Sequence, residues 1–103
     1  MEEFKGGLTE NYVFCQLTSG GFKVFFWRND KGTKEVDFII ALEGRLIPVE
    51  VKSADNTVSD SLKEYIKLFK PDYSIRISEK NFGMDGGIRS VPLYAVFCLQ
   101  AQD

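Results

Sequence analysis

Two acidic residues and a lysine interrupt the most apolar part of the chain. The segment EVDFIIALEGRLIPVEVKS, residues 35–53, carries Asp37, Glu50 and Lys52 within runs that are otherwise typical of buried strands. Carboxylates are ligands that Mg²⁺ prefers, and a lysine beside them can stabilise charge on a phosphate or activate an attacking water. These residue types therefore predict cation-dependent phosphate chemistry, provided that the fold brings them together.

The turn between the two strands of this segment determines which residues face one another. If Glu43 and Gly44 form a two-residue loop, the residue pairs can be counted from the turn outward along both strands. This count places Asp37 directly opposite Glu50, with Cβ atoms roughly 4.5–5.5 Å apart. Two carboxylates in that relation repel each other unless a cation lies between them. A single-ion site requires this arrangement, and an odd loop or a bulge would break it.

The same spacing also has an interpretation without a metal. The pairing that places Asp37 opposite Glu50 places Glu35 opposite Lys52, which is an ordinary cross-strand ion pair. The two acids then lie on a solvated face of the sheet. Pro48 cannot donate to a strand ladder and predicts an irregularity nearby. Spacing alone leaves both interpretations open.

Composition excludes several classes of function. The chain of 103 residues has no histidine, which excludes Ser-His-Asp and Cys-His catalysis and zinc sites built on histidine. A net charge of −2, from 13 basic and 15 acidic residues, is unlike that of a strong free-standing nucleic-acid binder. Without a signal peptide or a membrane span in the sequence, a cytoplasmic protein is expected. Cys15 and Cys98 lie in apolar segments and are expected to be buried free thiols.

The elements that must position these residues follow from the apolar periodicity. Helices are predicted over 8–18 and 59–70, the second with Thr57 and Asp60 as a capping box. Five strands are predicted, over 24–28, 35–42, 46–52, 73–77 and 91–99. A Gly-rich loop is expected over 81–89. This order predicts one α/β (α+β) domain, with a mixed central sheet flanked by helices.

An acid on one strand, a hairpin and then Glu50-Val51-Lys52 resemble the PD-(D/E)XK, or restriction-endonuclease-like, nuclease superfamily. The predicted order of elements is similar to its α-β-β-β-α-β core. The resemblance implies that Asp37 and Glu50 are metal ligands, that the carbonyl of Val51 is a third ligand and that Lys52 is the catalytic lysine. It also implies Mg²⁺ or Mn²⁺ as the cofactor and DNA as a partner.

The superfamily often adds an acid on its first helix, and Glu10 matches that position. On a helical wheel Glu10 shares a face with Val13, Phe14 and Leu17, so its side chain need not point into open water. The resemblance implies an auxiliary catalytic acid. An acid near a helix N-terminus is also favourable without any catalysis, and both interpretations stay open.

A narrower resemblance covers nearly the whole chain. The segments KGGLTENYVFCQL, VFFWR, EVDFII and IPVEVKS are similar to the uncharacterised C-terminal domain of prokaryotic AAA-type ATPases. This implies that residues 1–103 form a single nuclease-like domain from the C-terminal part of a longer ATPase, whose N-terminal module is a partner. The chain itself lacks the G-x-x-x-x-G-K-[ST] loop of a nucleotide site.

Two functions follow from these observations. The first is a metal-dependent nuclease that hydrolyses nucleic-acid phosphodiesters. The second is a catalytically silent DNA-binding, regulatory or protein-interaction module of the ATPase. The lysines at 63, 67 and 70 can meet a phosphate backbone or form a solvated helix face, and the aromatic run 25–27 can stack bases or fill a core. The sequence leaves these choices and the oligomeric state open.

Overall fold

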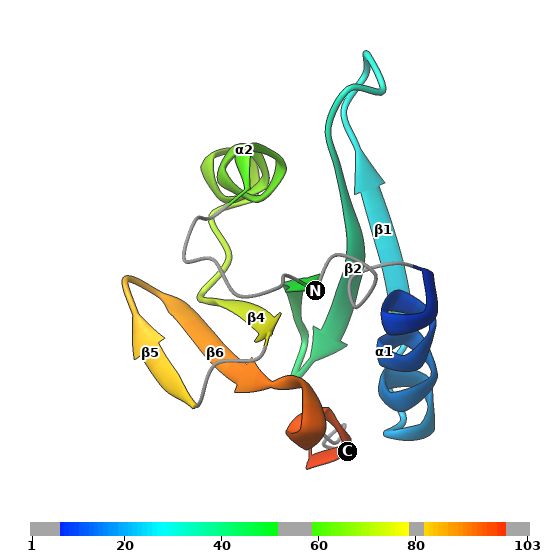
Figure 1. Ribbon diagram of the computed structural model, residues 1–103. Helices are drawn as coiled ribbons and strands as arrows, with labels where there is room; N and C mark the ends of the chain where they lie inside the picture. Colours follow the sequence, from blue (N-terminus) through cyan, green and yellow to red (C-terminus); the bar gives the residue numbers. More distant parts are fainter. Residues whose placement is uncertain (1–6, 52–58, 79–81, 99–103) are drawn as a thin grey trace.

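The computed structural model describes residues 7–51, 59–78 and 82–98 of the chain (Figure 1). The elements are α1 (Gly7–Ser19), β1 (Val24–Arg28), β2 (Glu35–Leu42), β3 (Arg45–Val51), α2 (Asp60–Phe69), β4 (Ser74–Ser78), β5 (Gly83–Asp85), β6 (Ile88–Pro92) and the 3₁₀ helix η2 (Leu93–Cys98). The predicted mixed α/β class and the order α1-β1-β2-β3-α2-β4 are confirmed. In these described ranges no helix is long and apolar enough to span a bilayer.

A single six-stranded sheet has the strand order β1-β2-β3-β4-β6-β5. The pairs β1–β2, β2–β3 and β5–β6 are antiparallel, whereas β3–β4 and β4–β6 are parallel. A parallel pair needs a crossover connection, and α2 supplies it between β3 and β4. The middle of the sheet is therefore fixed by the hairpin and by this crossover.

The β2–β3 hairpin has the register that the sequence predicts. Its pairs run from Leu42–Arg45 at the turn to Phe38–Val49. The turn residues Glu43 and Gly44 have φ angles of 54° and 78°. Two successive positive φ values are typical of a type I′ turn, whose twist matches that of the flanking strands. The predicted two-residue loop is thus confirmed.

The two faces of the sheet are covered by different helices (Figure 1). On one face α1 and η2 lie over a buried cluster that joins Val13 and Leu17 of α1 to strand residues such as Ile40 and Val49. On the other face Tyr65 of α2 packs against a smaller cluster. Each helix is held against the sheet by the burial of apolar side chains. Every strand side chain therefore lies either on the α1 face or on the α2 face of the sheet.

Helix α2 has defined caps at both ends. The hydroxyl of Ser59 accepts a hydrogen bond from the backbone N–H of Leu62 at 3.0 Å, so Ser59 is the N-cap. The predicted capping box needed Thr57, which lies outside the described residues. At the other end Lys70 adopts the left-handed conformation, and its N–H donates to the carbonyl of Ile66 at 2.8 Å.

The C-terminal third of the chain differs from the prediction. The expected loop over 81–89 contains β5 and the start of β6, and the expected strand over 91–99 ends at Pro92 and continues as η2. Gly86 and Gly87, with φ angles of 58° and 82°, form a tight hairpin turn between β5 and β6. Proline has no N–H to extend the ladder, so β6 ends there.

The expectation for Cys15 is also wrong, because this thiol is exposed. Val13 and Leu17 are the fully buried residues of α1. Cys15 lies halfway between them in sequence, which places it on the opposite side of the helix. The side chain of Cys98 lies outside the described part of the chain.

Candidate functional site

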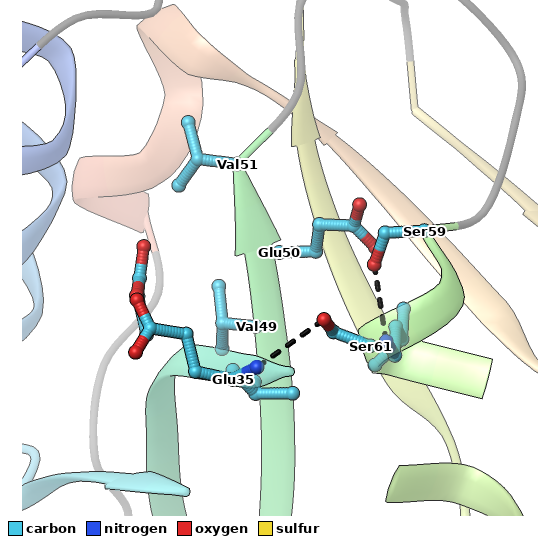
Figure 2. A pocket seen from close by; sticks show the side chains of 9 residues that line it. Glu35, Val49, Glu50, Val51, Ser59 and Ser61 are labelled. Atoms are coloured by element: carbon cyan, nitrogen blue, oxygen red, sulfur yellow. Dashed lines mark hydrogen bonds between the residues drawn. The ribbon is translucent and has the colours of Figure 1, made fainter. Parts of the chain in front are cut away.

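The strands β2 and β3 separate beyond the Phe38–Val49 pair, and a cavity of about 180 Å³ opens at that point (Figure 2). This fork cavity is lined by Glu35, Val36, Asp37, Val49, Glu50, Val51, Ser59, Ser61 and Leu62. Three of the predicted site residues, Asp37, Glu50 and Val51, therefore meet at one hollow beside the start of α2.

The register of β1 against β2 shifts at the same place. Phe25 pairs with Ile39, but Trp27, two residues later, pairs with Val36. Two residues of β2, at 37 and 38, thus oppose one residue of β1. This is a β-bulge, and a bulge re-aims the side chains that it contains. A count outward from the hairpin turn does not detect it.

The bulge places Asp37 and Glu50 on opposite faces of the sheet. Val36 packs in the cluster beside α2, so Asp37, which follows it, leaves β2 on the face of α1. Val49 packs in the core beneath α1, so Glu50 leaves β3 on the face of α2. The prediction that these two acids stand directly opposite on one face is therefore wrong, because it assumed an unbroken alternation along β2.

Three carboxylates gather on the α1 side: Glu10, Glu35 and Asp37, here termed the acid cluster. Burial raises the pKa of Glu10, and Asp37 raises it further by charge repulsion and by accepting a hydrogen bond from the protonated Glu10 carboxyl. Burial also raises the pKa of Asp37, as does the charge of Glu35, while the hydrogen bond from Glu10 lowers it. Glu10 is thus in contact with Asp37 and is not only a helix-terminal acid.

Glu35 belongs to the acid cluster through its charge and is also held by other groups. Its carboxylate lies 3.2 Å from Nε of Arg28 on the neighbouring strand, in an exposed ion pair. Its backbone N–H donates to the hydroxyl of Ser61 at 3.2 Å, which ties the start of β2 to α2 (Figure 2). The predicted partner of Glu35 was Lys52, which lies outside the described residues.

Glu50 has different surroundings. Figure 2 shows its side chain extending from β3 toward Ser59 at the start of α2, while that of Glu35 extends to the other side. The parallel ladder pairs Glu50 with Arg76 of β4, which is only 5% exposed. The Oε1 atom of Glu50 and the Nε and Nη2 atoms of Arg76 are buried. Glu50 therefore has a buried cationic neighbour on β4 and the start of α2 beside it.

The acid cluster offers two adjacent carboxylates to a hard divalent cation, but not a group of three. Within the ranges 7–51, 59–78 and 82–98, no three Cys, Asp or Glu side chains are grouped as a metal site would require. Glu10 and Asp37 nevertheless form an adjacent carboxylate pair, and Mg²⁺ often takes one or two carboxylates together with waters and substrate phosphates. Glu50 lines the same fork cavity as Asp37 but leaves β3 on the opposite face of the sheet. The predicted roles of Lys52 and of the Val51 carbonyl stay predictions.

Sequence reasoning missed several residues of the site. Glu35 precedes Asp37 by two positions, and this spacing was a usable signal for a shared face. Arg76 stands alone as a charge within the buried strand SIRIS, and an isolated charge in an apolar run is the same kind of signal that Asp37 gives. Ser59 and Ser61 carried no such signal, because their place beside the fork depends on how α2 docks.

Comparison with known proteins gives one result. Neither the curated proteins nor the solved structures yielded a match to the chain. A family model described as a domain of unknown function matches residues 5–96, and that description states no activity, ligand or partner. Because the match spans nearly the whole chain, the protein belongs to the domain of unknown function family DUF4143.

Proposed function

We propose that this chain is a cation-dependent phosphodiesterase-type domain that acts on nucleic acid, with Glu10 and Asp37 as the carboxylates that hold the cation. The observation that carries the proposal is the convergence of these two acids, from α1 and β2, where the β2–β3 ladder ends. The order of elements, which resembles that of the PD-(D/E)XK nucleases, supports the same reading.

The charge balance of the acid cluster explains why it would take a cation. The raised pKa values of Glu10 and Asp37 mean that the pair retains a proton at a higher pH than isolated carboxyl groups would. A bound cation would displace that proton and offset the repulsion among the three acids. Mg²⁺ or Mn²⁺ would supply Lewis-acid polarisation of a phosphate oxygen there.

The proposal differs from the sequence prediction in the role of Glu50. This residue faces α2 and Arg76, so it is not assigned to the cation. Lys52 follows Glu50 by two positions and remains the proposed group that assists the attacking water or stabilises phosphate charge. DNA remains the proposed substrate class, on the resemblance alone.

Hydrolysis assays with matched variants test the proposal. Plasmid DNA and single-stranded oligonucleotides are incubated with Mg²⁺ or Mn²⁺ and with the wild type, Asp37→Asn, Glu10→Gln and Asp72→Asn. Asp72 is an exposed acid paired with Arg45 at 2.9 Å, so its substitution controls for loss of a surface charge. We expect cleavage by the wild type and by Asp72→Asn only. No cleavage by the wild type, or equal cleavage by all four proteins, would contradict the proposal.

Cation binding is measured separately from cleavage. A ligand that binds only the folded state at 100 times its Kd raises the free energy of unfolding by about 2.7 kcal/mol. We expect Mn²⁺ to raise the melting temperature of the wild type and of Lys52→Ala, and Asp37→Asn to abolish that shift. Lys52→Ala should lose cleavage while it keeps the shift, because lysine assists the reaction without binding the cation.

A second candidate function is a catalytically silent module that binds DNA or an ATPase partner. The observation that favours it is the placement of Glu50 beside a buried arginine and on the opposite face of the sheet from Asp37. In that case Mn²⁺ would leave the melting temperature unchanged. Binding of DNA or of an N-terminal ATPase module would then be the same for Asp37→Asn and the wild type.

A further inference from the structure

A second, larger hollow lies at the tip of the β1–β2 ribbon, against α2. Its volume is about 520 Å³, which is within the range of small-ligand sites. The lining residues that matter here are Trp27, Arg28, Lys31, Lys34, Glu64 and Leu68. This hollow, termed the Trp27 pocket, shares no lining residue with the fork cavity.

The aromatic wall of the pocket is held in place from behind. Trp27 is half-buried and packs against the cluster formed with Tyr65. Its ring centroid lies 5.7 Å from that of Tyr65 and 6.2 Å from that of Phe69, with interplanar angles of 77° and 82°. Such edge-on contacts restrain the indole. A planar ligand that stacked on it would therefore lose little additional side-chain entropy.

The polar wall of the pocket is also formed in advance. The side-chain oxygen of Asn29 accepts hydrogen bonds from the backbone N–H groups of Thr33 at 2.9 Å and Lys34 at 3.2 Å. Its Nδ2 donates to the Thr33 hydroxyl at 3.1 Å. These bonds close the turn that carries Lys31 and Lys34, so both lysines are presented at the rim before a ligand arrives.

The charge of the pocket is positive although the chain is acidic. Arg28, Lys31 and Lys34 line it together with two acids, Asp30 and Glu64, whereas the whole chain has a net charge of −2. Arg28 also pairs with Glu35 at 3.2 Å, in an exposed contact that a phosphate would have to displace. The Lys34–Glu64 contact at 3.2 Å joins partly exposed groups. Exposed ion pairs contribute about 0–1 kcal/mol, so a phosphate can compete with such a pair for the lysine.

Helix α2 extends this positive region. Lys63 and Lys67 are exposed and directly precede Glu64 and Leu68, which line the pocket. Residues four apart lie one above the other on a helix, so these two lysines form a stripe beside the pocket wall. A phosphodiester chain that leaves the pocket across α2 would therefore meet further cations.

We propose that the Trp27 pocket binds one nucleotide of a single-stranded nucleic acid, with the base stacked on Trp27 and the adjacent phosphates at Arg28 and Lys31. An aromatic platform beside a row of cations is the general solution for binding single strands without sequence preference. Trp27 packs on the α2 face of the sheet, whereas Asp37 leaves β2 on the α1 face, and the pocket is joined to the acid cluster through Arg28, whose Nε lies 3.2 Å from Glu35. That the bound strand is the substrate rests on the proposed function.

The pocket contains its own reporter, because Trp27 is the only tryptophan of the chain. Its fluorescence is followed while the protein is titrated with oligothymidylate or with an abasic strand of the same length, in EDTA. We expect quenching by oligothymidylate and at least roughly 5-fold weaker binding of the abasic strand, because base–aromatic stacking is lost. Lys31→Glu should weaken binding of both strands.

A matched charge reversal controls for the net charge. Lys23→Glu makes the same change at an exposed residue that precedes β1, at the end of that strand opposite Trp27. It should bind as the wild type does. Equal weakening by Lys23→Glu and Lys31→Glu, equal binding of the two strands, or no quenching at millimolar oligonucleotide would each overturn the inference. Quenching by inorganic phosphate to the same extent would also overturn it, since it would indicate an anion site only.

The outcome is independent of cleavage. The titration contains no divalent cation, so strand binding is measured without hydrolysis. Binding without any cleavage would leave the pocket established and remove the proposed hydrolysis. Cleavage without quenching of Trp27 fluorescence would support the proposed hydrolysis and overturn the assignment of the pocket.

Discussion

The two sides of the β2–β3 fork hold the same kind of side chain in opposite electrostatic surroundings. On the α1 side, Glu10, Glu35 and Asp37 repel one another, and the pKa values of Glu10 and Asp37 are raised. On the α2 side, Glu50 pairs in register with a buried arginine and lies near a helix N-terminus. An acid in the first setting gains from a cation or a proton. An acid in the second is already compensated by the protein.

The largest expected effect comes from removing either Glu50 or its cationic neighbour Arg76 on the α2 side. Glu50→Gln should lower the free energy of unfolding by about 3 kcal/mol or more, because it leaves the buried Arg76 without the carboxylate beside it in the ladder. Arg76→Met should lower this free energy as well, because it removes the cation beside the half-buried Glu50. Urea unfolding at pH 7.5 measures the effect. In the double variant the loss should be clearly smaller than the sum of the two single losses. Additive losses would show that Glu50 and Arg76 do not depend on one another.

The same chemical change on the α1 side should have the opposite sign. Glu10→Gln removes one of the mutually repelling charges, so without divalent cations it should stabilise the fold by about 0.5 kcal/mol. A change of that size corresponds to a rise of roughly 2–4 °C in melting temperature for a domain of this length. Thermal unfolding in EDTA at pH 7.5 checks it. Destabilisation by Glu10→Gln would remove the contrast between the two sides.

The acid cluster should also contribute a specific pH dependence. The folded-state pKa values of Glu10 and Asp37 are raised, so between the ordinary and the raised values the native state binds more protons than the unfolded state. The free energy of unfolding therefore falls as the pH rises through that window, and it recovers on acidification. Urea unfolding of the wild type and of Asp37→Asn at several pH values measures the difference. The variant should show a smaller fall, and parallel profiles would contradict the assignment.

The smallest expected effect concerns Glu35, which influences Glu10 and Asp37 only through its charge. Glu35→Gln should lower the pKa of Asp37, because the charge of Glu35 helps to raise it. Stability should change by less than about 1 kcal/mol, since the Arg28–Glu35 ion pair is exposed. The carboxyl chemical shift of Asp37 is followed by NMR against pH. Glu64→Gln, which breaks the exposed pair with Lys34, is the control and should leave the Asp37 titration unchanged.

Much of the framework follows from local patterns in the sequence. The strand boundaries of β1 and β2, the register of the β2–β3 hairpin and the extent of α2 agree with the prediction to within a residue or two. Each depends on interactions among residues close in the chain, such as the positive φ values at Glu43 and Gly44. The Gly-rich segment 81–89 predicts a loop, whereas the structure forms a hairpin that turns at Gly86-Gly87, although the signal for such a turn is also local.

The orientation of the acids was decided by tertiary structure. The sequence by itself determined the register of the β2–β3 hairpin, and with it that Asp37 and Glu50 lie at corresponding positions on the two strands, because a turn sets the register by local geometry. It did not determine their faces. The bulge at 37–38 forms only when β2 pairs with β1 while α1 and α2 bury the two sides of the sheet, and these contacts join segments far apart in the chain. One residue inserted in a ladder reverses the direction of a side chain, so spacing alone could place these acids but not orient them.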